Sequence, residues 1–464
     1  MKVAQTIIII LFFSIITFAQ EQENFIHVIG DSLRGRIVNG ENIREVIGNV
    51  NITQGDVHII CDNAIQYLAK NKAELIGNVV LKQDSIIVET ERGFYDGNSK
   101  TAYSLTRISL NDGHIKLTAD SGYYFSEEKK SKFLGNVLLQ DSISTLKAKK
   151  LIYFNEEDKA IATGNVIVTQ QNSSLIADSL IHTRKNGVTL AFNNVALFDE
   201  KQKLLLIADE LIDSSKVNHS ILRGEPLLVQ VDTSKSGKLD TLFISSKEME
   251  AVKDSASDIM TAKDSVKIIR GEFASVNNYT FYNRKENFIF TYRTEQDINQ
   301  PILWYEETQL SGDSINIYLK DNELEWMNIN NNAFLLSLNK DYQDRYNQIS
   351  GKNIKMYFKN NNLYLTDVVG NVLSIYYLFE DKEPNGLLKS SAERIKVFFD
   401  STGVTDVKLY SSPSSEYHPE KMIKDKEKDF TLPTFIVYNN KPKKIDLLKS
   451  RKIPFYLFKK NSYE

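Results

Sequence analysis

The feature that most constrains the fold of this chain is a three-residue phrase, Gly-Asn-Val, that recurs with a period of 29 residues through the first half. The phrase stands at 48–50, 77–79, 135–137 and 164–166. The two other positions that the period predicts, 106–108 and 193–195, keep an aliphatic third residue. A fixed period of this length is typical of a repeat architecture, so function is expected on a long surface rather than in one pocket.

Apolar and polar residues alternate within each unit, as in Val50-Asn51-Ile52. Because successive side chains of a strand point to opposite faces, this alternation predicts strands that are each buried on one face. Aliphatic residues recur two, four and eleven positions after the glycine, and we call these positions the interior columns. Their members are Val50, Ile52, Ile59, Val79, Leu81, Val88, Ile108, Leu110, Leu117, Val137, Leu139, Leu146, Val166, Val168 and Leu175.

Turn residues fall at two places in each unit: six and seven residues after the glycine (54–55) and again at 20 to 23 (96–99). A second phrase, Ala-Asp at 119–120, 177–178 and 208–209, lies opposite Gly-Asn when these hairpins are folded, and Cys61-Asp62 takes the same place. Glycine inside a strand marks a bend. The pattern predicts an all-β fold, a creased antiparallel β-jellyroll (a V-shaped "β-taco") built of 29-residue repeats. A parallel β-solenoid is the alternative, but the hairpin-like turns favour the antiparallel meander.

The chain is expected to fall into five parts. A basic Lys2, an apolar run over 7–16 and the small residues of Thr17-Phe18-Ala19 indicate a secretory signal peptide over 1–19, cleaved after Ala19. An uncleaved anchor is the alternative. The regular repeats cover 20–230, an irregular β segment 231–300, and a second repeat region with a spacing of 39 residues and longer turns 301–412. A Lys-rich, mostly solvated tail covers 413–464.

Charge and chemistry exclude several classes of function. The net charge is −3, so no global basic field is present to hold nucleic acid. The six histidines show no metal-ligand spacing, and His58 with Cys61, the one cysteine, is the nearest pair. Carboxylates that recur at the crease are more often structural than catalytic, because a general acid is needed only once. These carboxylates are Asp62, Glu91, Asp120 and Asp178. We therefore expect no enzyme, no cofactor and no metal site.

The alternating phrases resemble the OstA-like (LptA-like) family of periplasmic lipopolysaccharide-transport proteins, and most of all its large Bacteroidetes-type members. The resemblance is carried by 48–54 (Gly-Asn-Val-Asn-Ile-Thr-Gln), by 119–124 and by 177–182. It extends over about 40–230 and returns at 310–400. It implies a periplasmic protein whose open interior holds the acyl chains of lipid A, so that the interior columns are the lipid-binding residues. It also implies end-to-end stacking on other lipopolysaccharide-transport proteins through exposed edge strands.

Two alternatives to this function remain open at this point. If the two halves of the V pack tightly, the interior columns form an ordinary closed core and the chain is a structural or interaction module of the cell envelope. An exported glycan-active enzyme is the other alternative, and it would require one irreplaceable pair of carboxylates. The distance between the two halves decides between an open trough and a closed core.

Overall fold

The computed structural model describes residues 26–449 apart from 234–238, 255–256, 298, 322, 340 and 402. The expected signal peptide at 1–19 and the last part of the tail lie outside the described residues. The chain forms two compact units, Met1–Gly135 and Asn136–Glu464, and each is treated by itself below.

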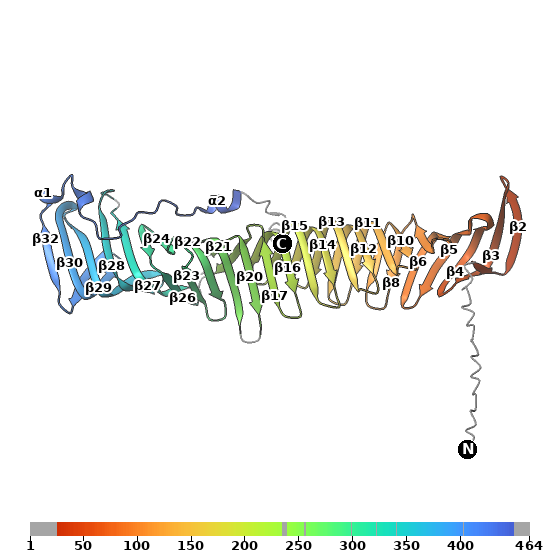
Figure 1. The fold of residues 1–464 in the computed structure, drawn as a ribbon, viewed down its shortest axis with the longest axis horizontal. Coiled ribbons are helices and arrows are strands. Elements are labelled where there is room, and N and C mark those ends of the chain that lie inside the picture. The colour runs from red at the N-terminus through yellow and green to blue at the C-terminus, as the bar shows by residue number, and fades with distance from the viewer. Residues whose placement is uncertain are drawn as a thin grey trace, which may run out of the picture. The chain divides into compact units, whose positions relative to one another are not determined.

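The first unit consists of consecutive strands joined by short turns, with one turn of 3-10 helix at Leu68–Lys70 (Figure 1). Its strands are β1 (His27–Ile29), β2 (Ser32–Val38), β3 (Glu41–Gln54), β4 (Val57–Tyr67), β5 (Lys72–Gln83), β6 (Ile86–Asp96), β7 (Thr101–Ser104), β8 (Ile108–Asn111), β9 (Lys116–Ala119), β10 (Ser121–Phe125) and β11 (Lys130–Gln140).

The second unit continues in the same way and ends in short helices, α1 (Glu420–Ile423), a 3-10 turn (Glu427–Asp429) and α2 (Lys444–Lys449). Its strands are β12 (Ser144–Phe154), β13 (Lys159–Gln170), β14 (Ser173–Thr183), β15 (Val188–Asp199), β16 (Leu204–Ser214), β17 (His219–Arg223), β18 (Leu227–Thr233), β19 (Leu239–Ser245), β20 (Glu248–Lys253), β21 (Asp258–Arg270), β22 (Phe273–Asn283), β23 (Phe288–Tyr292), β24 (Ile302–Tyr305), β25 (Thr308–Ser311), β26 (Ser314–Lys320), β27 (Glu323–Leu338), β28 (Tyr346–Lys359), β29 (Asn362–Glu380), β30 (Glu383–Asp400), β31 (Gly403–Tyr410) and β32 (Ser414–His418).

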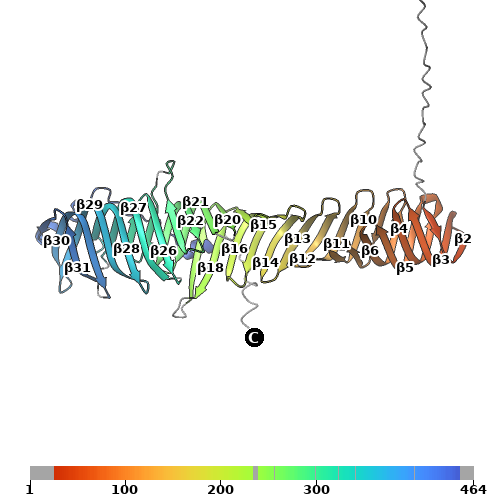
Figure 2. The ribbon, with the colours of Figure 1, turned by 90° about the horizontal axis from the view of Figure 1, so that it is seen from below.

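Neighbouring strands pair antiparallel throughout the described part of each unit, as the side-by-side strands of Figure 2 show. The predicted antiparallel meander is therefore confirmed, and these pairings exclude the parallel solenoid. The first turn of the repeat lies one residue later than predicted, because Gln54 pairs with Val57 and leaves 55–56 as the turn. The shift arises from an extra, unpaired residue at the Gly-Asn phrase earlier in the same strand.

Each Gly-Asn phrase is a β-bulge in which two consecutive residues adopt left-handed backbone angles. Gly77 has φ +77° and Asn78 has φ +46°, and the register of β5 with β6 shifts between Ile76 and Val79. Glycine reaches this region without strain, and asparagine reaches it more easily than most residues. Equivalent pairs occur at 48–49, 135–136, 164–165, 193–194, 224–225, 264–265, 331–332, 370–371 and 411–412. At the slot 106–107 the strand is broken between β7 and β8 instead.

At several bulges the partner is the aspartate of the Ala-Asp or Cys-Asp phrase on the opposite strand, whereas Gly164 faces Lys149. A Cβ built on Gly77 would lie 2.3 Å from Oδ2 of Asp62, so any other residue there would have to displace this carboxylate. The same Oδ2 accepts a hydrogen bond of 2.9 Å from Nδ2 of Asn78. The second unit repeats the contact between Asn194 and Asp178 at 2.8 Å. The crease carboxylates Asp62 and Asp178 thus have a structural partner.

The crease divides each strand into two arms that face each other. Arm A runs from the crease to turns such as 55–56, and arm B runs from the crease to turns such as 68–71 and 97–100. In the second unit one buried cluster joins the arms, with Leu228 and Ile244 of arm A packed with Leu222 and Met249 of arm B. We call this side of each arm the inner face, and the fold is the predicted creased β-jellyroll.

The later parts of the chain are more regular than the sequence indicated. Residues 231–300 were expected to be an irregular β segment, and the described ones include well-paired strands, among them β21 and β22. Asp264-Ser265 replaces Gly-Asn there, so the phrase disappears although the bulge remains. In 301–412 the longer period comes mainly from longer strands rather than longer turns, since β27 to β30 have 14 to 19 residues each.

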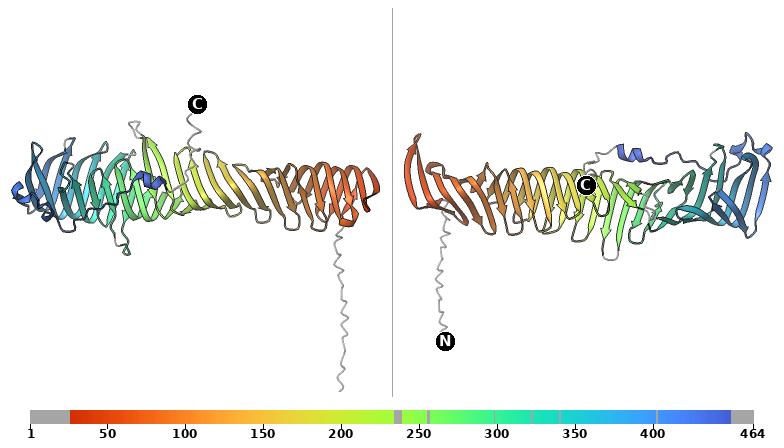
Figure 3. Two further views of the ribbon diagram at one scale, coloured as in Figure 1. Left: turned by 90° about the horizontal axis from the view of Figure 1, so that it is seen from above. Right: turned by 180° about the vertical axis from the view of Figure 1, so that it is seen from behind.

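The end of the described chain, 419–449, lies along the outer face of arm A, and we call it the strap (Figure 3). Ile423 and Leu432 are buried against Phe334 and Leu336, and Leu447 is buried in a separate apolar cluster nearer to β19. Most residues of the strap are exposed, as expected of a mostly solvated tail, but these three buried side chains anchor it to the second unit. Arm A of this unit is apolar on both faces, and the strap covers the outer one.

Candidate functional site

The interior columns form continuous cross-strand rows on the inner face of arm A. In the first unit one row runs Ile52, Ile59, Leu81, Val88, Leu110 and Leu117, with each residue paired to the next. These side chains are 0 to 5% exposed. The predicted columns are therefore aligned, and in the first unit they form a closed core.

Glutamine–tyrosine contacts join the two arms of the first unit at the ends opposite the crease. Gln54, at the end of its arm A strand, accepts a hydrogen bond of 2.7 Å from the hydroxyl of Tyr95 on arm B. Its Nε2 donates to the backbone oxygen of Gly97, in an arm B turn, at 3.1 Å. The glutamine therefore reaches across from one rim of the V to the other.

The next repeat contains the same contact. Gln83 accepts a 2.5 Å hydrogen bond from the hydroxyl of Tyr124, and both side chains are less than 5% exposed. Burial raises the pKa of the Tyr95 and Tyr124 hydroxyls, so both stay protonated and donate. We call these two contacts the rim bridges, and they close the mouth of the first unit. The sequence analysis missed them, although a glutamine six residues after the start of a repeat and a tyrosine eighteen residues after the start of the next one occur in both cases.

The same row opens in the second unit. Val168, Leu175, Leu197 and Leu206 follow Leu146 in register on β13 to β16, and all four are half-buried. Their positions are equivalent to those of fully buried residues in the first unit. An apolar strip on the inner face thus remains accessible over these strands.

The residues that form rim bridges in the first unit differ where the row opens. The pair at the same separation of 41 residues is Asp141 and His182, so both residues of the bridge are replaced, and Gln170 of the next repeat is exposed. The imidazole of His182 lies 3.0 Å from the hydroxyl of Thr189 on the neighbouring strand of the same arm. Burial lowers the pKa of His182, so the imidazole is neutral at pH 7. The side chain at this position therefore contacts its own arm, as expected for a mouth that is not bridged there.

The row closes again at Leu228, Ile244 and Ile268 and opens a second time towards the end of the unit. There a cavity of about 160 Å³ lies between the arms. Its lining is mainly aliphatic and includes Leu335, Ile349, Met356, Leu363, Ile395 and Val397. The second unit therefore has two stretches in which apolar side chains of the inner face are accessible.

Of the fifteen interior-column residues singled out in the sequence, thirteen are buried, with Leu139 the most exposed of them at 8%. Val168 and Leu175 are half-buried and line the first open stretch. The structure therefore brings the fifteen residues onto one face, as the periodicity predicts, but leaves only the last two of them accessible.

The histidine–cysteine pair considered in the sequence does not form a ligand set. His58 is exposed and Cys61 is 5% exposed, because the two side chains lie on opposite faces of β4. Burial raises the pKa of the Cys61 thiol to about 11, as expected for a small buried side chain. Within the described residues, no group of three His, Cys, Asp or Glu side chains lies close enough to hold a metal ion.

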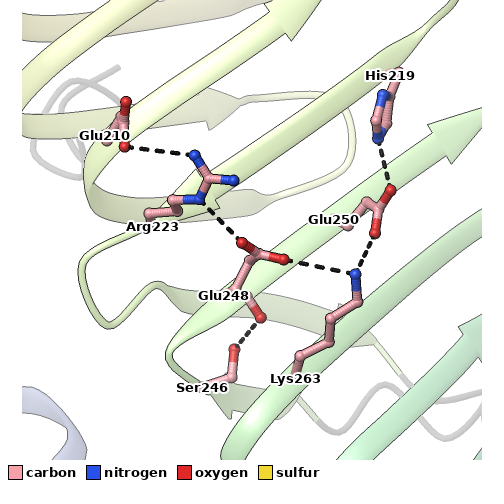
Figure 4. A network of polar contacts seen from close by, with 7 residues as sticks. All are labelled: Glu210, His219, Arg223, Ser246, Glu248, Glu250 and Lys263. Carbon is pink, nitrogen blue, oxygen red and sulfur yellow. Dashed lines mark hydrogen bonds and ion pairs between the residues drawn. The ribbon is translucent and has the colours of Figure 1, made fainter.

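A cluster of charged side chains crosses β16, β17, β20 and β21 on the outer face of arm B (Figure 4). Lys263 lies 2.6 Å from Glu250 and 3.5 Å from Glu248, and His219 lies 2.8 Å from Glu250. Hydrogen bonds from Lys263 and then His219 lower the pKa of Glu250. Because this carboxylate is held ionised, it is unsuited to act as a general acid, and the cluster stabilises neighbouring strands.

No helix in the described part of the chain is long and apolar enough to span a membrane. The strands and bulges described above define the protein's class: an all-β, creased antiparallel jellyroll. Residues 25–121 match the family described as OstA-like protein, so the resemblance seen in the sequence is confirmed over this region.

The structure is also similar to the crystal structure of LptH from Pseudomonas aeruginosa, whose title describes the LptA-homologous periplasmic component of a lipopolysaccharide transport device. The TM-score is 0.22 at 9% identity, and the match covers 27% of this chain and 92% of LptH. No curated protein matches the chain in sequence.

Proposed function

We propose that this chain is a periplasmic lipopolysaccharide-binding protein that carries lipopolysaccharide from the inner to the outer membrane during outer-membrane assembly. The match of residues 25–121 to the OstA-like family supports this function, since the members that the phrases resemble act in lipopolysaccharide transport. In this proposal the acyl chains of lipid A occupy the space between the arms of the second unit, and the chain has no enzymatic activity.

The observation that carries the proposal is the change in exposure along one aliphatic row. Leu110 of the first unit is 0% exposed, whereas Leu197, at the same position of its repeat, is half-buried. Leaving an accessible apolar strip costs free energy in water, roughly 25 cal/mol for each Å² that is not buried. A bound acyl chain would recover this free energy, and a row with no apolar ligand would be expected to close as it does in the first unit.

The closed core of the first unit favours a second candidate function. There the rim bridges join the two arms and the interior columns are buried, as expected for a structural or interaction module. We propose that the first unit acts as such a module, and that the lipid compartment begins near Val168. The thirteen buried members of the interior columns then support the fold rather than bind lipid.

The proposed lipid compartment can be tested by site-specific photo-crosslinking in cells. A photoreactive phenylalanine analogue at 168 or 197 is expected to give lipopolysaccharide adducts. The same analogue at Thr169 is the matched control, because Thr169 is exposed beside Val168 on the other face of β13. Adducts from 169 that equal those from 168, or none from either inner position while transport is active, would refute a lipid-binding interior.

The proposal includes end-to-end contacts with other lipopolysaccharide-transport proteins through edge strands. In the described chain β2 pairs with β3, and all seven of its residues are exposed, including Leu33 at 56% and Ile37 at 74%. An exposed apolar edge strand invites strand addition. Changing both Leu33 and Ile37 to lysine should abolish co-purification with the partner and leave the fold intact; undiminished co-purification would exclude β2 as the docking edge.

A further inference from the structure

The strap is fixed to arm A by two buried glutamines that contact its backbone in the same way. Gln348 donates to the oxygen of Phe430 at 3.1 Å and accepts from the amide of Leu432 at 2.8 Å. Gln309 donates to the oxygen of Ile436 and accepts from the amide of Tyr438, both at 2.8 Å. Each side-chain amide thus donates to and accepts from the strap backbone, and Gln348 also donates to the oxygen of Tyr346 at 3.3 Å. These two glutamines hold 430–432 and 436–438, and the segment 433–435 connects the two contacts.

A cavity of about 750 Å³ lies beside this connecting segment, on the outer side of the second unit. One wall is the strap, with Pro433, Thr434, Ile436 and Tyr438, and the opposite wall is the crease, with the bulges 331–332 and 370–371. Figure 3 shows the strap running beside these strands. The cavity is open to solvent, because Ile436 is 50% exposed. This site is separate from the space between the arms, which lies on the inner face.

The lining of the cavity combines amide side chains with an apolar surface. The amides are Asn299, Gln300, Asn331, Asn332 and Asn371. Hydroxyl groups come from Ser311, Ser350, Thr434 and Tyr438, and apolar surface from Phe334, Leu373 and Ile436. Amides and hydroxyls can both donate and accept hydrogen bonds, whereas aromatic rings pack against C–H groups.

Charges at the site are almost balanced. Arg293 lies 2.8 Å from Asp313, which also accepts hydrogen bonds from Gln300 at 3.2 Å and Asn332 at 3.0 Å. The guanidinium and the carboxylate therefore neutralise each other. Lys352 is exposed at the cavity and adds one positive charge. The site thus suits a neutral or singly acidic ligand better than a strongly charged one.

We propose that this cavity, between the strap and the crease of the second unit, is a binding site for an oligosaccharide. A saccharide presents vicinal hydroxyls, which match the amides, and C–H faces, which match the ring of Tyr438 and the accessible apolar surface of Leu373 and Ile436. The volume lies within the range of ordinary ligand pockets, about 300–1,000 Å³. Two glycans of the bacterial envelope have this chemistry, the sugars of lipopolysaccharide and those of peptidoglycan, and the experiment distinguishes them.

The test is calorimetric titration of the purified chain with saccharide probes. The probes are delipidated lipopolysaccharide core oligosaccharide and the peptidoglycan disaccharide of N-acetylglucosamine and N-acetylmuramic acid, with glycerol as the control. Binding of one or both saccharides below about 1 mM, without binding of glycerol, is expected. The saccharide that binds identifies the source of the ligand.

Ser350→Phe provides the variant that fills the cavity. Ser350 is half-buried between Phe334 and Leu373 on the outer face, so the added ring packs on apolar neighbours and occupies the site. The matched control is Ser391→Phe, because Ser391 is also half-buried and pairs with Leu373 from the other side but does not line the cavity. Ser350→Phe should weaken binding at least about tenfold, and the control should leave it unchanged.

Circular dichroism checks that both variants fold. If Ser350→Phe does not fold, Asn299→Ala, at an exposed residue, serves in its place and should weaken binding about threefold or more. No saccharide binding by the parent chain, or equal binding by the parent and the filled variant, overturns the proposal. Lipid adducts from 168 and 197 would persist in that case, so the failure of this site is distinct from the failure of the lipid compartment.

Discussion

Leu110 and Leu197 hold the same position in repeats three periods apart, and their replacement by alanine should have different consequences. Leu110 is 0% exposed in the closed row of the first unit, and Leu197 is half-buried in the open stretch of the second. The same three-carbon truncation is therefore made in a packed environment and in an accessible one. The comparison measures directly whether the interior is closed in one unit and open in the other.

Truncating a fully buried leucine removes its transfer free energy and leaves a cavity, so Leu110→Ala should cost about 3–5 kcal/mol of local stability. A half-buried leucine has already left part of its surface in water, and water can fill the space that the truncation creates. At about 25 cal/mol per Å², Leu197→Ala should cost roughly 1 kcal/mol or less. The expected difference of at least about 2 kcal/mol is large compared with the error of such measurements.

Native-state hydrogen exchange followed by mass spectrometry is the suitable assay, because repeat proteins need not unfold in one step. Peptides from β8 and β9 should lose protection in Leu110→Ala, whereas peptides from β15 and β16 should change little in Leu197→Ala. Equal losses at the two sites would refute the claim that the row opens, and lipid binding in the second unit would lose its structural basis. Saturating lipopolysaccharide should protect β15 and β16 in the parent chain more than in Leu197→Ala.

Three further predictions concern single residues. Gly77→Ala should destabilise the first unit by about 1–3 kcal/mol, since φ is +77° and the new Cβ would meet Asp62; an unchanged melting temperature would contradict the bulge geometry. Tyr124→Phe removes the hydroxyl that donates to buried Gln83 and should cost about 1–3 kcal/mol in denaturant unfolding, unlike Tyr410→Phe at an exposed position. Burial depresses the pKa of His182, so the unfolded chain takes up this proton first as the pH falls. Stability should decline as the pH drops below about 6.5, and His182→Gln should reduce the difference in melting temperature between about pH 7.5 and pH 5.5; the same difference in both proteins would exclude His182 as a cause.

The crease is the part of the fold that the sequence predicts best, because its physical requirements are local. A left-handed bulge needs glycine or asparagine, and the strand opposite needs a small residue and a hydrogen-bond acceptor, so Gly77-Asn78 and Asp62 recur as short phrases. Where the bulge uses Asp264-Ser265 the phrase is lost, and the sequence indicated only an irregular β segment. Other residues can adopt the same backbone at a higher cost, so the absence of the phrase does not exclude the bulge.

The strap and the cavity beside it were not predictable from the pattern. Nothing in the sequence distinguishes Gln309 and Gln348 from other glutamines. They bind the strap backbone only because residues 82 to 129 positions later in the chain lie against them. The Lys-rich composition of the tail predicted a mostly solvated segment, and most of its described residues are exposed. Strand periodicity does not report that the outer face of arm A is apolar and holds a few side chains of this distant segment. Ile423 and Leu432 are buried against the outer face of arm A. From the alternation of apolar and polar residues alone, that face would be predicted to be exposed to solvent.

By itself the sequence determined the period, the alternation, the crease and the row of interior aliphatic residues, because each of these depends on neighbours within one or two strands. Only the tertiary structure decided whether that row is closed or open. Leu110 and Leu197 are the same residue at the same position of the repeat, and the difference between them comes from the opposite arm. In the first unit the arms are joined across the mouth by contacts such as that of Gln54 with Tyr95, between residues about forty positions apart, and no local pattern of the sequence reports such a contact.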